Sequence, residues 1–460
     1  MRFGPILVTV SLLSACAYRA DGMRPEVDMP MMLTETPGST LPVWPETDWW
    51  HRFGSLELDS LIDQAKARNQ DLAAASARVR QAAALARVAR APLLPAMGVA
   101  ANLSATSSND RIGVASGVYP DATLTASYEI DFWGRNSAAA ASADAALRAR
   151  RSDRAVVALG VMTSVANAYF QVLAAREQTA IAGRNLAAAE AMLRQVEARQ
   201  RAGKALEREV AQQRALSLAQ RASIPPLELA AAEAQATLAV LLGIPAQGFA
   251  VAGENLGGIL PAPVTPGLPS DLLTRRPDIA SAEAALAAAK ADVAAARAAM
   301  FPRITLTGAA GVQSAALSSI TEGASAAYFL IGGLMQPIFD NGALAGRHEQ
   351  AKARQEELTA LYRGAVMAAF ADVRRSLEAT TRRRQEQEAQ ERVVAATGQA
   401  FALARMQYEA GAEDMLVLLD TQRTLFAAQS RLSQIRLARL EALIMLYKAL
   451  GGGWQESRPQ

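Results

Sequence analysis

The chain contains Arg276-Pro277-Asp278-Ile279 at the start of an alanine-rich run that closes at Met300-Phe301-Pro302. Roughly 207 residues earlier, Asn69-Gln70-Asp71-Leu72 opens a similar run that closes at Pro92-Leu93-Leu94-Pro95. Further pairs keep this register to within a residue: Phe132 with Phe339, Gly203 with Gly411, and Gly243 with Gly451. Two copies of this size are too large for a solenoid repeat and indicate a duplicated unit with internal pseudo-symmetry. A symmetric conduit uses two similar halves, whereas a catalytic site rarely needs them.

Each copy contains a segment in which apolar residues alternate with small or polar ones. In the first copy this segment covers about 98–133, and in the second about 303–340. Alternation with a period of two over about ten residues predicts paired strands, so each segment is expected to form a β-hairpin. In the first hairpin a polar loop is expected between Ser107 and Pro120.

Helical patterning surrounds the hairpins. A helix is expected from Leu56 to Ala91, and after the hairpins very long helices are expected over 136–202 and 343–410. A helix of roughly 67 residues spans on the order of 100 Å. Glycines 203 and 411 should end the long helices, and return helices are expected over 206–242 and 413–450. The lengths of a return helix and a first helix add up to the length of one long helix. Two shorter helices stacked end to end can therefore run beside each long one.

Four strands cannot close a barrel alone, and an open sheet edge is untenable in lipid. Membrane barrels need eight or more strands, so several chains must share theirs, and three chains leave an open lumen. The predicted fold is mainly α with a membrane β-barrel, built from a duplicated helix–β-hairpin–long helix–helix unit. Three chains would form a twelve-stranded barrel with four strands per chain. The alternative is a small soluble sheet packed on helices.

Composition excludes several other functions. The net charge is +3 over 460 residues, with no basic cluster interleaved with aromatics, so nucleic-acid binding is not expected. The uncharged stretch 156–175 is long enough to span a bilayer, but its polar stripe and charged flanks favour a buried helix of a bundle. His51 and His348 are the only histidines and lie far apart, so neither a metal site nor any cofactor is expected. No conventional active site is visible, and an enzyme is not predicted.

The only cysteine of the chain is Cys16, and it follows a short apolar stretch and Leu13-Ser14-Ala15. This pattern is typical of a secretory signal, and it resembles a bacterial lipobox, in which the cysteine becomes the acylated first residue. The alanine that follows the cysteine, at position 17, resembles the pattern of lipoproteins that are sorted to the outer membrane. The expected layout is therefore signal peptide 1–15, lipidated extended segment 16–55, first repeat 56–250, linker 251–269, second repeat 270–454 and tail 455–460.

Several motifs together resemble one family, the outer membrane factors, and within it the NodT-type efflux lipoproteins (TolC-like channels). These motifs are Asp271-Leu272-Leu273-Thr274-Arg275-Arg276-Pro277-Asp278-Ile279, Phe301-Pro302-Arg303-Ile304-Thr305-Leu306, Gln336-Pro337-Ile338-Phe339-Asp340-Asn341-Gly342 and Glu129-Ile130-Asp131-Phe132-Trp133-Gly134-Arg135. The resemblance implies a homotrimer in the outer membrane, with its barrel on a long α-helical periplasmic tunnel, that exports small molecules. It also implies a periplasmic adaptor protein and an inner-membrane pump of the RND type as partners. A second possibility is the exit duct of a type I peptide or protein secretion system. A third is a structural coiled-coil lipoprotein or an adaptor that never spans the membrane.

A passive duct needs a lining, a closure and a docking surface. By resemblance to the family's periplasmic aperture, Asp420 and Arg423 are the expected closing contacts, with Tyr408 as a lining residue and Asp414 and Glu409 nearby. Threefold symmetry would turn an inward-facing carboxylate into a ring that attracts cations. Relatives often carry a basic residue where Glu409 stands, so one link between subunits is expected to be absent or reversed. The turns at Gly203 and Gly411 are the expected docking points for the adaptor.

Overall fold

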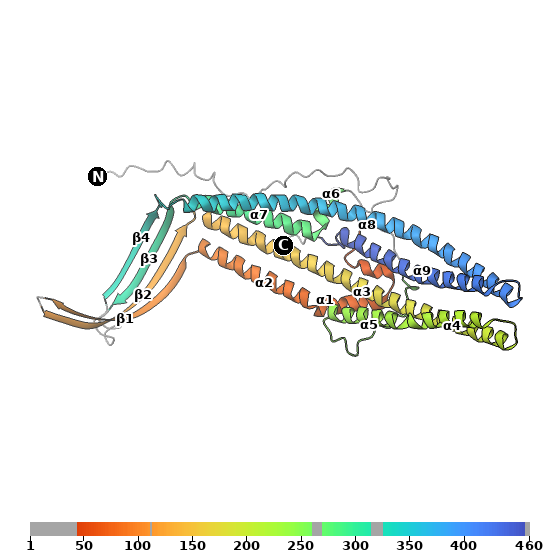
Figure 1. Ribbon diagram of the computed structural model, residues 1–460. Helices are drawn as coiled ribbons and strands as arrows, with labels where there is room; N and C mark the ends of the chain where they lie inside the picture. Colours follow the sequence, from red (N-terminus) through yellow and green to blue (C-terminus); the bar gives the residue numbers. More distant parts are fainter. Residues whose placement is uncertain (1–43, 111–112, 260–268, 314–324, 456–460) are drawn as a thin grey trace. The chain divides into compact units, whose positions relative to one another are not determined.

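The computed structural model describes residues 44–110, 113–259, 269–313 and 325–455. The expected signal peptide and Cys16 therefore lie outside the described residues. The helices are α1 (Leu56–Arg68), α2 (Gln70–Arg90), α3 (Arg135–Arg201), α4 (Glu207–Ala222), α5 (Ile224–Leu241), α6 (Pro269–Arg275), α7 (Pro277–Ala298), α8 (Ala343–Glu409) and α9 (Met415–Ala449), with short 3-10 turns η2 (Trp49–Phe53) and η3 (Ala91–Leu93). The strands are β1 (Ala96–Asp110), β2 (Gly113–Ile130), β3 (Arg303–Gln313) and β4 (Ser325–Met335) (Figure 1).

The chain divides into two compact units, and each contains residues of both repeats. The first, called the sheet unit here, contains the strands and the helix segments within Ala77–Ser152 and Ala280–Gly364. The second, called the helical unit, contains Val27–Ser76, Asp153–Ile279 and Ala365–Gln460. The long helices α3 and α8 contribute residues to both units. The compact units therefore differ from the sequence repeats.

The sheet unit contains one antiparallel sheet with the order β1-β2-β3-β4 (Figure 1). Both expected hairpins are confirmed, and β2 pairs with β3, which joins them into one sheet. The expected loop from Ser107 to Pro120 is wrong, because β1 runs to Asp110 and β2 begins at Gly113. An antiparallel ladder is held by backbone hydrogen bonds, so it continues through polar residues where the alternation has faded.

The two faces of the sheet differ in polarity. One row of the ladder, Val99–Leu124–Ala310–Tyr328, lies on one face because paired residues point to the same side. That face also carries Met97, Leu103, Ile130, Ile304, Leu306, Leu330 and Leu334. The opposite face of β2 and β3 carries mainly polar residues: Asp121, Thr123, Thr125, Ser127, Glu129, Arg303, Thr305 and Thr307. The sheet thus has an apolar face and, over β2 and β3, a polar one.

The two long helices are confirmed to within a residue of their expected ends. Each ends in the same motif, in which a glycine takes a left-handed conformation: φ is +72° at Gly203 and +76° at Gly411. The amide of Lys204 donates to the carbonyl of Arg199, and that of Ala412 to the carbonyl of Gln407, both at 2.9 Å. These bonds satisfy carbonyls at the ends of the helices, which otherwise lack partners.

Two expected helices are interrupted. The helix expected from Leu56 to Ala91 breaks at Asn69, which has an extended ψ of 130° and whose Oδ1 accepts from the Leu72 amide at 3.0 Å. The return helix expected over 206–242 is divided at Ser223, because Pro225 and Pro226 follow and have no N–H to donate. The return helix of the second copy has no proline and runs unbroken as α9.

In both copies, the end of the return helix contacts the break between the two short helices. Asn69 donates its Nδ2 to the carbonyl of Leu241 at 2.8 Å, and Arg276, at the equivalent position, donates Nη1 to the carbonyl of Ala449 at 3.1 Å. Arg276 is buried and also pairs with Asp278 at 2.6 Å, an interaction that lowers the pKa of that carboxyl although burial opposes it. Short helices stacked end to end, as expected from their lengths, are therefore held by matching contacts in the two copies.

The main core of the helical unit surrounds the middle of α3. The uncharged stretch 156–175 supplies Val165, Phe170 and Leu173, which are buried in one cluster with residues of η2, α1, α5 and α9. Trp49 belongs to the same cluster, and its ring stacks on Tyr447 with centroids 5.0 Å apart. In the described residues, α3 is long and apolar enough to cross a membrane, but more than half of its most apolar window is buried. These contacts explain the apolar stretch as a core helix.

Candidate functional site

The turn between α3 and α4, which contains Gly203, and the turn between α8 and α9, which contains Gly411, lie at the same end of the helical unit (Figure 1). Next to these turns, the helices α3, α4, α8 and α9 share one apolar cluster. It consists of Met192, Val196, Val210, Leu216, Ala404, Tyr408, Met415, Leu418 and Leu419. Each helical hairpin therefore buries its apolar stripe against the other. We call this four-helix end of the helical unit the tip.

Arg199 connects the two hairpins of the tip. Its Nη1 donates to the backbone carbonyls of Tyr408 at 3.2 Å and Glu409 at 3.0 Å, and its guanidinium lies 4.8 Å from the centre of the Tyr408 ring. The carbonyls at the end of a helix carry partial negative charge, so a cation there is stabilising. Arg199 of α3 therefore caps the end of α8.

Tyr408 forms a second connection between the hairpins. Only 4% of Tyr408 is exposed, and its hydroxyl donates to Oε2 of Glu209 on α4 at 3.3 Å. Burial, and then the charge of Glu209, raise the pKa of the phenol, so it remains a donor at neutral pH. Within a single chain Tyr408 is buried and fastens one hairpin to the other; its role as a lining residue of the aperture stays a prediction.

Two further expected residues have local partners. Glu409 accepts a hydrogen bond from Nε2 of Gln195 at 3.1 Å and lies 3.8 Å from Arg405 on its own helix. Asp414 is the N-cap residue of α9, since its Oδ1 accepts a hydrogen bond from the Leu416 amide at 2.9 Å. Glu409 thus adds a third contact between the hairpins, and Asp414 fixes the start of α9.

Asp420 and Arg423 project outward from α9. Both are exposed, and neither forms an ion pair with any described residue of the same chain. Between them lies Gln422, which is fully buried. The pair therefore occupies the face of α9 that points away from the apolar cluster of the tip, where a neighbouring copy or the solvent can meet it.

Arg199, Gln195 and Glu209 were not among the residues predicted from the sequence. All three belong to the first copy, whereas the candidates were sought near Gly411 in the second. The available signal was the spacing of Arg199 and Glu209 to either side of Gly203, which places them at a helix turn. Their partners could not be read from spacing, because these contacts join residues about two hundred positions apart.

The tip offers fixed charges and hydrogen bonds but no arrangement typical of catalysis. Among the residues that the structure describes, no group of three or more His, Cys, Asp or Glu side chains is placed to hold a metal ion. Groups of this kind can hold helix hairpins together and attract or repel ions by their charge.

Comparison with known proteins finds one family model and several relatives that are outer membrane proteins. The family model described as outer membrane efflux protein matches this chain twice, over residues 61–244 and 268–452. The pyoverdine export outer membrane protein OpmQ of Pseudomonas aeruginosa is 47% identical over 424 residues, covering 89% of this chain and 88% of OpmQ. The outer membrane protein OprJ of the same organism is 32% identical over 421 residues, covering 89% and 87%.

Solved structures are similar in fold over nearly the whole chain. The outer-membrane channel OprN superposes with a TM-score of 0.88 at 28% identity, covering 96% of this chain and 99% of OprN. The open state of the Neisseria gonorrhoeae MtrE outer membrane channel has a TM-score of 0.84 at 30% identity, covering 94% and 97%.

Proposed function

This chain belongs to the outer membrane efflux protein family, and on that premise we propose that three copies form one export channel of a tripartite efflux system. The protein is an outer membrane efflux channel, a passive duct and not an enzyme. The main support for the trimer is the structure of the sheet. It has an apolar face and a polar face, and its two edge strands are β1 and β4.

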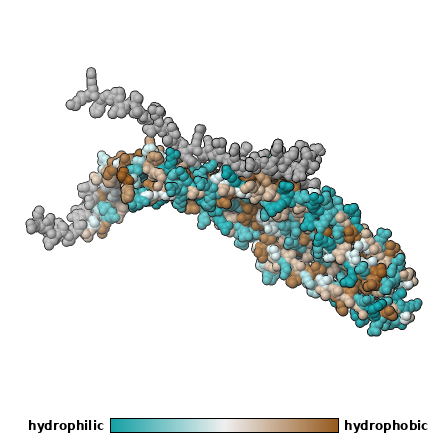
Figure 2. Space-filling view, turned by 45° about the horizontal axis from the view of Figure 1, so that its top comes forward, coloured by the Kyte–Doolittle hydropathy of each residue, from teal (hydrophilic) through white to brown (hydrophobic). Residues whose placement is uncertain are grey.

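The outer strands require partners in lipid. An unpaired backbone N–H or C=O in hydrocarbon costs several kcal/mol, about 2–7 for each group. If β4 of one copy pairs with β1 of the next, three copies close a barrel of twelve strands with the apolar face outward and the polar face lining a lumen. The helical parts also expose apolar side chains among charged ones, including Leu361, Met367, Leu403 and Met406, which neighbouring copies can cover (Figure 2).

The partners follow from the same premise. Relatives of this chain are named as outer membrane proteins of efflux pumps, among them the probable efflux pump protein TtgC of Pseudomonas putida at 31% identity. We therefore expect a periplasmic adaptor and an inner-membrane pump of the RND type. The turns at Gly203 and Gly411 are the docking points we propose for the adaptor. Apart from the two chain neighbours of each glycine, no described atom lies within 4 Å of the Cβ position at either one, so another helix can approach closely.

Efflux of small solutes is favoured over protein secretion by the relatives, which are named for export of pyoverdine and efflux of toluene and antibiotics. Cys16 stays a prediction: acylation there would attach the chain to the outer membrane lipid in addition to the barrel. Several acyl chains together anchor a protein firmly.

The proposed gate combines contacts within and between chains. Arg199, Tyr408 and Glu409 fasten the α8–α9 hairpin to the α3–α4 hairpin of the same chain. Asp420 and Arg423 remain available for the neighbouring copies. Three Asp420 carboxylates around one axis would repel anions and concentrate cations, while Arg423 of an adjacent copy can pair with them.

We expect Asp420→Ala to increase single-channel conductance and to reduce the preference for cations, because it removes both the negative ring and the partner of Arg423. The measurement is a bilayer recording of the purified trimer with a gradient of potassium chloride. Asp63→Ala is the control, since Asp63 is an exposed carboxylate of α1 that pairs only with Lys66 of its own helix. Unchanged conductance and selectivity in Asp420→Ala would show that Asp420 is not part of the closure.

A further inference from the structure

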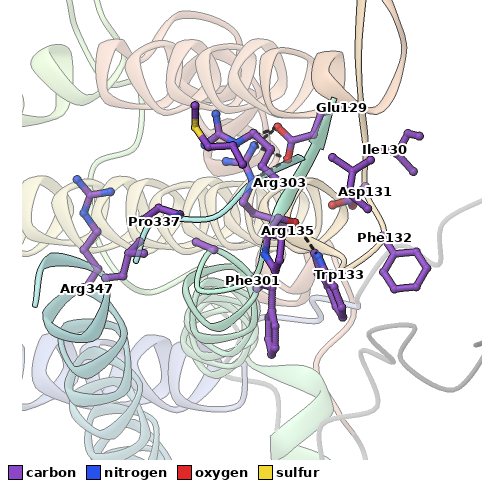
Figure 3. A pocket seen from close by; sticks show the side chains of 16 residues that line it. Glu129, Ile130, Asp131, Phe132, Trp133, Arg135, Phe301, Arg303, Pro337 and Arg347 are labelled. Atoms are coloured by element: carbon purple, nitrogen blue, oxygen red, sulfur yellow. Dashed lines mark hydrogen bonds and ion pairs between the residues drawn. The ribbon is translucent and has the colours of Figure 1, made fainter. Parts of the chain in front are cut away.

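The loop that follows β2 packs on the segment that precedes β3. In that loop the ring of Trp133 stacks on Phe301 with centroids 4.8 Å apart, and its Nε1 donates to the carbonyl of Pro302 at 2.8 Å (Figure 3). The two segments meet because β2 and β3 are antiparallel neighbours, so that Ile130 at the end of β2 pairs with Ile304 near the start of β3. This contact joins the first repeat to the second where the sheet meets the helices.

The loop between β4 and α8 is the equivalent loop of the second repeat, and it is fixed at both ends. At its start, Nε2 of Gln336 donates to the carbonyl of Met300 at 3.1 Å. At its end, Asp340 accepts a hydrogen bond from the Leu344 amide at 2.8 Å and so caps α8, as Asp131 caps α3 in the first repeat. The backbone between these two points is therefore held in place.

The middle of this second loop exposes two large apolar side chains. Ile338 is 91% exposed and Phe339 is 85% exposed, whereas Trp133 and Phe301, which cover each other, are 36% and 42% exposed. Neighbouring apolar side chains that a fixed backbone holds in the open are typical of a contact surface. The loop after β4 therefore has the anchoring of its counterpart but not the cover.

The segment before β1 is the matching surface in the first repeat. Leu94-Pro95 aligns with Phe301-Pro302 at the offset of 207 residues between the repeats. Leu94 is 71% exposed. The order β1-β2-β3-β4 places two strands between the start of β1 and the end of β4 of one chain. The second repeat can therefore repeat the contact of the first only with another copy of the chain.

We infer that Ile338 and Phe339 of each copy pack on Leu94 and Pro95 of the next copy, a contact that depends on the proposed trimer. When β4 of one copy pairs with β1 of the next, the two strands are antiparallel, so the end of β4 lies beside the start of β1. The new contact then alternates around the barrel with the contact inside each chain. It is purely apolar, because the second loop has no counterpart of the hydrogen bond that Trp133 donates.

The test is crosslinking of the double variant Leu94→Cys/Phe339→Cys in the outer membrane with a short bis-maleimide. The chain carries an ordinary signal peptide and Cys16→Ser, so that no other thiol is present. We expect most chains to run as covalent dimers and trimers on a denaturing gel, and each single-cysteine variant to run as one chain. The matched control is Leu124→Cys/Phe339→Cys, which should also run as one chain. Leu124 lies six residues before the end of β2, a separation of roughly 20 Å along the strand.

Unheated samples of the same preparations report the trimer independently. If trimers form but the Leu94/Phe339 pair yields only single chains, lipid or solvent covers the loop, and the contact is wrong while the channel stands. Covalent dimers from Phe339→Cys alone would place the loops of two copies against each other and would also overturn the contact. Absence of trimers from the wild-type protein would remove the proposed function and this contact with it. Should the double variant fail to assemble, Ile338→Cys takes the place of Phe339→Cys.

Discussion

Leu124→Arg is expected to prevent insertion of the channel into the membrane. Leu124 lies near the middle of β2 on the apolar face, between Val99 and Ala310 in the ladder. An arginine that faces lipid near the middle of a bilayer costs about 2–4 kcal/mol, and the trimer would contain three of them. The measurement is the fraction of chain recovered in the outer membrane as heat-resistant oligomer.

Ser127→Arg is the matched control for this substitution. Ser127 belongs to the same strand but lies on the polar face, where it pairs with Ala96 and Thr307. The same side chain should be tolerated there, because a lumen is filled with water. Equal insertion of both variants, or loss of both, would mean that the apolar face does not meet lipid.

Gly451→Ala should destabilise the helical unit more than a change of this size usually does. Gly451 has φ of +85°, and a Cβ there would lie 1.9 Å from the carbonyl oxygen of Arg275. Relief of that clash requires separation of the end of α9 from the end of α6, which breaks the neighbouring bond from Arg276 to Ala449. We expect a loss of about 4 kcal/mol or more, from backbone strain and lost packing together. Thermal unfolding of the trimer followed by circular dichroism measures it.

Gly411→Ala separates the two causes of that loss. Gly411 has φ of +76°, so alanine is strained there as well, but apart from its two chain neighbours no described atom would lie within 4 Å of the added Cβ. The control should therefore lose only about 1–3 kcal/mol, the usual range for a strained backbone. Equal shifts of the midpoint in the two variants would show that the end-to-end helix junction does not contribute to stability.

Much of the fold could be predicted because its signals are local. Alternating polarity indicated both hairpins, and the glycines at 203 and 411 indicated the ends of the long helices, since a left-handed residue there is a local requirement. The break at Asn69 could not be predicted, because its partner is the carbonyl of Leu241, far along the chain. The break at Ser223 had a visible signal in Pro225-Pro226 that the helical pattern of the neighbouring residues obscured.

The candidate site was less accessible to sequence reasoning. Asp420 and Arg423, suggested by the family resemblance, are both exposed on α9, and their part in closure stays a prediction. The sequence indicated that Tyr408 lies near the turn, but not whether its side chain is buried. Its burial depends on Glu209 and Arg199 of the other hairpin. A helix presents apolar and polar faces, but the sequence of one hairpin does not specify which neighbour covers each face.

Export through this protein requires that the sheets of three chains close into one cylinder in the membrane. The most direct test is sedimentation equilibrium of the detergent-solubilised protein, secreted with an ordinary signal peptide and with serine in place of Cys16 so that no acyl chain is attached. Particles with the mass of three chains, recovered from the outer membrane, are predicted. A single chain per particle, soluble without detergent, would contradict the account.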